Sequence, residues 1–230
     1  MKERNVILIL ICANAEWQAI SNMYKLSVKH NSPFGEYFMI KNDNEDLIFL
    51  QTGCGKVNAA AASQYAYDKW NPNLIINLGT CGGFEGDVKV GDLLLINETV
   101  IYDIIEELGK VDETLENYRT IIDLSWIDPK LTSDCIRSIM LSADKDIVPS
   151  EIHELKRKYS AIAADWESAA IAFVAIRNRV KCLILRGVSD IVGESIQEIY
   201  NNDKLFKERT NIIMKKLIDN SLISNIIKDS

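Results

Sequence analysis

Four acidic residues follow apolar stretches whose length suits β-strands: Glu16, Asp165, Glu167 and Asp190. Carboxyl groups gathered at a site of low dielectric take different pKa values, so one can serve as an acid and another as a base. Considered singly, Asp165, Glu167 and Asp190 are each better explained as a helix cap, because acidic side chains near a helix N-terminus accept hydrogen bonds from free N–H groups. Their recurrence at several strand exits nevertheless favours an acid–base site.

Two glycine-rich segments accompany these acids. Residues 53–58 read Gly-Cys-Gly-Lys-Val-Asn, a strand-to-helix turn that can direct backbone N–H groups towards an anion. The segment lacks the third glycine of a dinucleotide fingerprint and the ending of a P-loop, so an ordinary turn is the better interpretation. Residues 77–84 place Thr80 after a buried apolar run, where ligands collect in open α/β sheets. Cys81 has no adjacent His to activate it, so a nucleophilic role is not expected.

Apolar and helical patterns alternate along the chain and must position these residues. Most apolar runs are continuous, which indicates strands buried on both faces of a central sheet. The predicted strands are residues 6–12, 47–50, 74–78, 93–96, 161–164 and 182–188, and the predicted helices are 16–24, 57–70, 131–140, 168–179 and 195–218. The polar residues 102–128 are predicted to form a loop-rich excursion, either a lid or a partner surface. The alternation predicts an α/β sandwich in one domain, residues 1–230.

Composition narrows the class of protein. The formal net charge of -7, from 33 acidic and 26 basic residues, argues against nucleic acid or an anionic membrane as a partner and favours a small-molecule ligand. The first apolar run is too short to span a membrane, and no export signal is evident, so a cytoplasmic protein is expected. Five scattered cysteines predict reduced thiols. With His30 and His153 far apart in sequence, we expect no metal ion.

Together, these motifs resemble those of the 5′-methylthioadenosine/S-adenosylhomocysteine nucleosidases in the nucleoside phosphorylase superfamily. The matching segments are residues 13–16, 52–60, 77–83, 165–170 and 188–190. The resemblance implies a three-layer α/β/α nucleoside phosphorylase fold with a mixed central sheet that partly closes into a barrel. It also implies a homodimer that hydrolyses a purine nucleoside without a metal or organic cofactor.

The same resemblance implies a role for each matching residue. Glu16 activates the attacking water, Asp190 protonates N7 of the leaving purine, and Glu167 holds the ribose hydroxyls. Thr80 helps to position the water or the ribose. Further substrate contacts are implied at Cys81, Gly82, Asp146, Ile147, Asp165, Trp166 and Ser189. The chemistry is coherent, because an oxocarbenium-like state needs a carboxylate near the sugar and an acid at the base.

Two other functions remain open at this stage. Nucleoside phosphorylases carry an Arg shortly before the glycine-rich turn, and Asn77 stands there in this chain, so water is the expected nucleophile. A non-catalytic nucleoside-binding protein is the second alternative. It is motivated by Asp146 and Trp166, which stand where the nucleosidases usually have Phe and Met. If turnover is kept, these two replacements imply that Asp146 contacts a different base edge or that Trp166 takes over stacking on the base.

Overall fold

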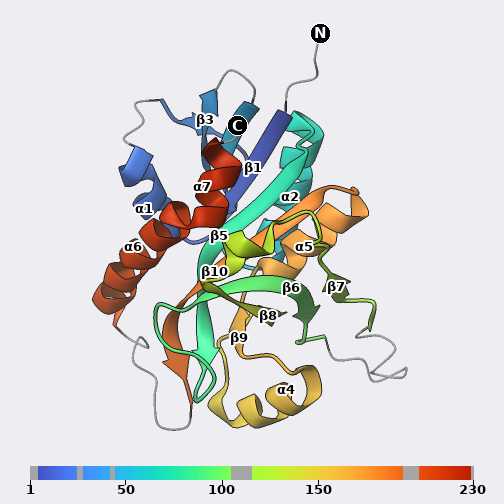
Figure 1. Cartoon of the computed structure of the whole chain (residues 1–230), viewed down its shortest axis with the longest axis vertical. Coiled ribbons are helices and arrows are strands. Elements are labelled where there is room, and N and C mark those ends of the chain that lie inside the picture. The colour runs from blue at the N-terminus through green and yellow to red at the C-terminus, as the bar shows by residue number, and fades with distance from the viewer. Residues whose placement is uncertain (1–4, 25–27, 42–44, 105–115, 194–201, 229–230) are drawn as a thin grey trace.

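The computed structural model describes residues 5–24, 28–41, 45–104, 116–193 and 202–228 of the 230-residue chain (Figure 1). The strands are β1 (Asn5–Ile11), β2 (His30–Asn31), β3 (Glu36–Lys41), β4 (Glu45–Gln51), β5 (Leu74–Phe84), β6 (Leu93–Ile101), β7 (Arg119–Ile121), β8 (Cys135–Ser142), β9 (Ala163–Asp165) and β10 (Lys181–Val192). The helices are α1 (Asn14–Tyr24), α2 (Lys56–Trp70), α4 (Ile152–Tyr159), α5 (Ser168–Arg177), α6 (Asp203–Asp219) and α7 (Ser221–Lys228). Short 3-10 turns occupy Pro129–Thr132 and Pro149–Glu151.

One mixed sheet runs through the molecule in the order β10-β6-β8-β9-β5-β1-β4-β3-β2, with β7 added to β6. Parallel pairing joins β1 to both β4 and β5, and β5 to β10, whereas β10 and β6 are antiparallel. The additional pairing of β10 with β5 closes β5, β10, β6, β8 and β9 into a ring. The expected mixed sheet that partly closes into a barrel is therefore confirmed.

Helices cover this sheet on two sides and complete three layers. In Figure 1, α1, α6 and α7 lie on one side of the strands, and α2 and α5 lie on the other. Ala59, Ala62 and Ala66 are fully buried on the inner face of α2, where small side chains let the helix approach the sheet closely. The α/β sandwich predicted from the alternating patterns is confirmed.

Several predicted boundaries were wrong. Residues 131–140 have helical spacing, but most of this segment is strand β8, which pairs in parallel with both β6 and β9. Pairing on both edges outweighs a weak helical preference in a run rich in Ser, Thr and Ile. Strands β5 and β10 extend well beyond the predicted 74–78 and 182–188. The glycine-rich segment after residue 78 is thus part of a strand rather than a turn.

The described part of the predicted helix 195–218 is helical. Helix α6 begins at Asp203, and the Oδ1 atom of Asn202 caps it by accepting a hydrogen bond from Leu205 N at 3.1 Å. Residues 195–201 of the predicted helix lie outside the described residues. In the predicted excursion 102–128, residues 119–121 form β7, and residues 105–115 again lie outside the described part.

The five cysteines are free thiols, as predicted. Three of them, Cys12, Cys81 and Cys182, are buried in the core. Burial raises the pKa of the Cys81 thiol well above its ordinary value, so this side chain stays protonated and a poor nucleophile. Across the described residues, none of the helices combines the length and apolar character needed to span a bilayer.

Candidate active site

A cavity of about 740 Å³ lies where β5, β9 and β10 meet the first turns of α1 and α6. All the predicted site residues line it: Glu16, Thr80, Cys81, Gly82, Asp146, Ile147, Asp165, Trp166, Glu167, Ser189 and Asp190. Asn202, Asp203 and Phe206 of the α6 end also line it. The structure thus brings the predicted site residues together from five separate segments of the sequence, and the start of α6 adds a sixth.

The carboxylate of Glu16 is held in one orientation. Its Oε1 atom accepts hydrogen bonds from the backbone N of Thr80 at 2.6 Å and from the Thr80 hydroxyl at 2.8 Å. Its Oε2 atom accepts from Ala13 N at 3.0 Å. Glu16 is only 3% exposed, so these three donors replace the hydration that an ionised carboxylate requires. Such a fixed, desolvated carboxylate suits a general base.

Arg186 is a buried cation that the sequence analysis missed. It lies within β10, is 1% exposed, and donates from Nε to Ser168 Oγ at 2.9 Å and from Nη2 to Asn77 Oδ1 at 2.6 Å. Its Nη2 also lies 2.8 Å from Asp165 Oδ2. An arginine within an otherwise apolar run was the available signal, because buried charges require partners.

Asp165 anchors the turn that carries Glu167. Besides the ion pair with Arg186, its carboxylate accepts from Ser142 Oγ at 2.6 Å and from the backbone N of Ser168 at 3.2 Å. For Asp165 the capping alternative is therefore right, since it binds N–H groups of the first turn of α5. Although it lines the cavity, its carboxylate is engaged by protein donors.

Glu167 is not a helix cap. It stands at the N-cap position of α5 but makes no capping bond, and its Oε1 atom instead accepts from Gly55 N at 2.9 Å. Burial, followed by the negative charge of Asp165, raises the pKa of Glu167 from 4.5 to about 8. At neutral pH the carboxyl is mainly protonated and can both donate and accept a hydrogen bond.

Asp190 lies inside strand β10 rather than after it. The β10–β5 register shifts between Val188 and Asp190, which marks a β-bulge at Ser189. The Ser189 hydroxyl lies 2.7 Å from Asp190 Oδ1. A Cβ atom at Gly82 would approach Ile147 Cδ1 to 2.6 Å, so a larger residue there would displace the Ile147 side chain that lines the cavity. The bulge and Gly82 together make room for a ligand beside the Asp190 carboxyl.

The backbone N–H groups of the glycine-rich turn before α2 bind carboxylates of this same chain. Gly55 N donates to Glu167, and Lys56 N donates to Asp144 Oδ1 at 2.8 Å. The Lys56 ammonium contacts Asp103 and Asp144. The turn therefore does direct N–H groups towards anions, but these anions are side chains of the protein.

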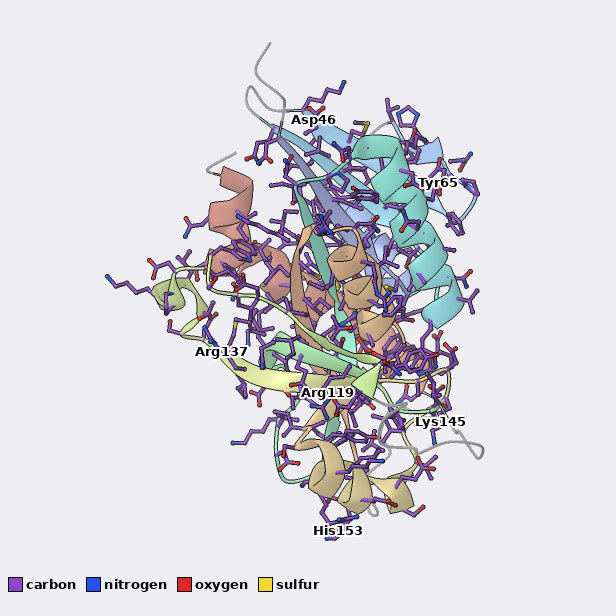
Figure 2. All side chains as sticks on the ribbon, turned by 90° about the vertical axis from the view of Figure 1, so that its right-hand side faces the viewer. Asp46, Tyr65, Arg119, Arg137, Lys145 and His153 are labelled. Carbon is purple, nitrogen blue, oxygen red and sulfur yellow. The ribbon has the colours of Figure 1, made fainter. Side chains whose placement is uncertain are left out.

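Among the predicted site residues, two are exposed. Asp146 is exposed, and Trp166 is 38% exposed at the link between β9 and α5. Neighbouring Lys145 also lines the cavity, and its ammonium lies 2.6 Å from Glu151 Oε2. His153 is exposed on α4, at the end of the molecule opposite Asp46 (Figure 2), and takes no part in the site.

A family model described as the phosphorylase superfamily matches residues 7–219. The 5′-methylthioadenosine/S-adenosylhomocysteine nucleosidase of Geobacillus sp. (strain WCH70) is 30% identical over 161 residues, which cover 65% of this chain and 69% of the relative. The enzyme of that name from Marinomonas sp. (strain MWYL1) is 23% identical over 223 residues, covering 91% and 96%. The chain therefore belongs to the phosphorylase superfamily. Within it, the chain is a relative of the 5′-methylthioadenosine/S-adenosylhomocysteine nucleosidases.

Solved structures share the fold at low sequence identity. The nucleosidase of Helicobacter pylori with butyl-thio-DADMe-Immucillin-A aligns with a TM-score of 0.80 at 19% identity, covering 100% of both chains. Futalosine hydrolase of Helicobacter pylori strain 26695 aligns with a TM-score of 0.80 at 20% identity, covering 96% of this chain and 98% of that one. Since two differently named hydrolases match equally well, the fold alone does not select the substrate.

Proposed function

We propose that this protein hydrolyses the N-glycosidic bond of a purine nucleoside of the methylthioadenosine or S-adenosylhomocysteine type. The observation that carries the proposal is the Glu16 carboxylate, fixed by Thr80 and Ala13 in the cavity that also holds Glu167 and Asp190. The names of the sequence relatives support the substrate class.

In this proposal, the reaction needs three carboxyl groups in different states. Glu16 accepts a proton from water as the water oxygen bonds to C1′ of the ribose. The bond between C1′ and N9 breaks, its electron pair moves into the purine, and Asp190 gives a proton to N7. Glu167, mainly protonated, holds the ribose hydroxyls while positive charge develops on the sugar.

Three observations favour water over phosphate as the nucleophile. The amides of the glycine-rich turn are bound to Glu167 and Asp144. The buried Arg186 is bound to Asp165, Asn77 and Ser168. Among the described residues that line the cavity, Lys145 is the one cationic side chain, and it pairs with Glu151. A phosphate dianion entering this cavity would find mainly carboxyl groups, which disfavours phosphorolysis.

We also propose that the chain forms one domain, acts in the cytoplasm and assembles as a homodimer. The homodimer is supported by the family resemblance and by the exposed apolar residues Val57, Ile121 and Ile176 on α2, β7 and α5. Sedimentation of the purified protein tests it, because a mass near twice 26.0 kDa is expected.

Release of free base tests the proposed reaction. Methylthioadenosine, S-adenosylhomocysteine, adenosine and inosine are each incubated with and without phosphate. We expect phosphate-independent release that Glu16→Gln lowers by about 100-fold or more, whereas Glu154→Gln on the exposed face of α4 leaves the rate unchanged. Release only with phosphate would support the phosphorylase instead.

The non-catalytic alternative is separated by Asp190→Asn. An enzyme loses most of its rate when the acid at the leaving base is removed, by about 100-fold or more. A binding protein has no rate to lose. A change in ligand affinity, measured by tryptophan fluorescence, would then be the only effect of the substitution. No base release from any nucleoside in the panel by the wild-type protein would favour the binder.

A further inference from the structure

The β-bulge in β10 leaves a buried backbone carbonyl outside the strand ladder. Pairing with β5 passes from Val188–Cys81 directly to Asp190–Gly82, so Ser189 has no partner residue in that register. Pairing of β10 with β6 covers only residues 184–187. Ser189 is 2% exposed, and a buried carbonyl without a donor is costly. The Ser189 carbonyl therefore needs a donor from another element.

Arg209 of α6 supplies this donor. Its Nη1 atom lies 3.1 Å from the carbonyl oxygen of Ser189, and a hydrogen bond from a charged donor is stronger than a neutral one. Because the Ser189 carbonyl carbon is bonded directly to the backbone N of Asp190, this contact fixes the peptide that carries the proposed acid.

The same helix reaches the cavity at its N-terminal end. Phe206, one turn before Arg209, lines the cavity, and residues three apart lie on the same side of a helix. A ligand that contacts Phe206 therefore touches the helix whose next turn holds the Ser189 carbonyl. Helix α6 thus both lines the cavity and contacts the peptide that carries the proposed acid.

We propose that Arg209 is a positioning residue: by holding the Ser189 carbonyl, it fixes the position of the Asp190 carboxyl relative to the leaving base. The inference rests on the proposed function, in which Asp190 protonates the base. Arg209 takes no part in proton transfer in this proposal, so its effect on the rate is expected to depend on Asp190. This relation distinguishes it from a residue that merely stabilises α6.

A double-mutant cycle tests this relation. Steady-state hydrolysis of methylthioadenosine is followed over a range of substrate concentrations, which gives kcat and KM, for the wild type, Arg209→Ala, Asp190→Asn and the double variant. We expect Arg209→Ala to lower kcat about 10- to 100-fold, the usual cost of misplacing a reacting group by about 1 Å. In the Asp190→Asn background the same change should alter the rate less than about threefold, because the group it positions is absent.

Two further variants separate positioning from loss of folding. Arg209→Lys keeps a cationic donor and should recover part of the rate, while Lys215→Ala removes an exposed cation from the same helix and should leave the rate unchanged. Melting temperatures are measured for every variant, and if Arg209→Ala does not fold, Arg209→Lys takes its place in the cycle.

Equal loss in both backgrounds would overturn the inference, as would a change in KM alone or an undiminished rate in folded Arg209→Ala. If Asp190→Asn itself keeps the wild-type rate, the proposed function fails first, and the inference fails with it.

Discussion

Replacing Glu167 by Gln should stabilise the folded protein at neutral and alkaline pH. Burial and Asp165 raise the pKa of Glu167 from 4.5 to about 8, so the folded state keeps a proton that the unfolded state releases. Below pH 4.5 both states are protonated; as the pH rises from 4.5 to about 8 the folded state loses stability, and above that range the loss is constant. The amide side chain of the Gln variant does not titrate, so the variant does not lose this stability. Its amide oxygen can still accept the hydrogen bond from Gly55 N.

The size of the effect follows from the pKa difference. At about 1.4 kcal/mol for each pKa unit, the wild type loses about 5 kcal/mol above pH 8, about 3 kcal/mol at pH 7 and less than about 1 kcal/mol at pH 5. Glu167→Gln should therefore exceed the wild type in stability by margins that grow with pH. Its hydrolytic rate should fall, because the proposed ribose contact changes.

Urea unfolding between pH 5 and pH 9, followed by circular dichroism, measures this margin. Glu154→Gln on the exposed face of α4 is the matched control and should track the wild type at every pH. A stability difference between Glu167→Gln and wild type that is equal at pH 5 and pH 9 would refute the reasoning, because it would mean that the Glu167 carboxyl titrates normally.

Three further predictions concern the same site. Gly79→Ala should reduce hydrolysis by about 100-fold or more, because the added Cβ would lie 1.9 Å from Arg186 Nη1 and 2.9 Å from Glu16 Oε1; steady-state rates check this. Asp165→Ala should cost about 3–5 kcal/mol in urea unfolding by leaving Arg186 buried without its carboxylate, and a cost below about 1 kcal/mol would contradict the ion pair's role. Adenosine 5′-monophosphate should have a kcat/KM about 100-fold below that of adenosine, since the cavity lining is rich in carboxyl groups. Equal values for the two substrates would show that charge does not select the ligand.

The position of the site could be predicted because its residues recur at one kind of place. Glu16, Thr80 and Glu167 each follow a buried apolar run. Strands β1 and β5 are parallel, which brings Glu16 and Thr80 to one edge of the sheet, whereas β9, before Glu167, runs antiparallel to β5. The contacts between them could not be predicted. The bond from Gly55 N to Glu167 joins residues 112 positions apart, and nothing in either segment identifies the other.

The wrong boundaries have a common physical origin. Residues 135–140 became a strand because they pair with β6, and Met140 also pairs with β9; this long-range pairing outweighs local spacing. Strand β10 was predicted to end at Val188, where the apolar run ends, yet a bulge accommodates Ser189 and Asp190 within the strand. Arg186 was overlooked because its partners come from two other segments, Asn77 in one and Asp165 and Ser168 in the other.

The fixed carboxylates also have a consequence for the order in which the chain folds. Glu16 depends on Thr80 across 64 positions, Lys56 on Asp144 across 88, and Arg186 on Asn77 across 109. Contacts of such high sequence separation form slowly, because a long loop must close before they contribute. No short fragment of the chain can assemble this site. Recovery of hydrolysis during refolding should therefore lag behind recovery of helical signal, and activity becomes a reporter of the last contacts to form.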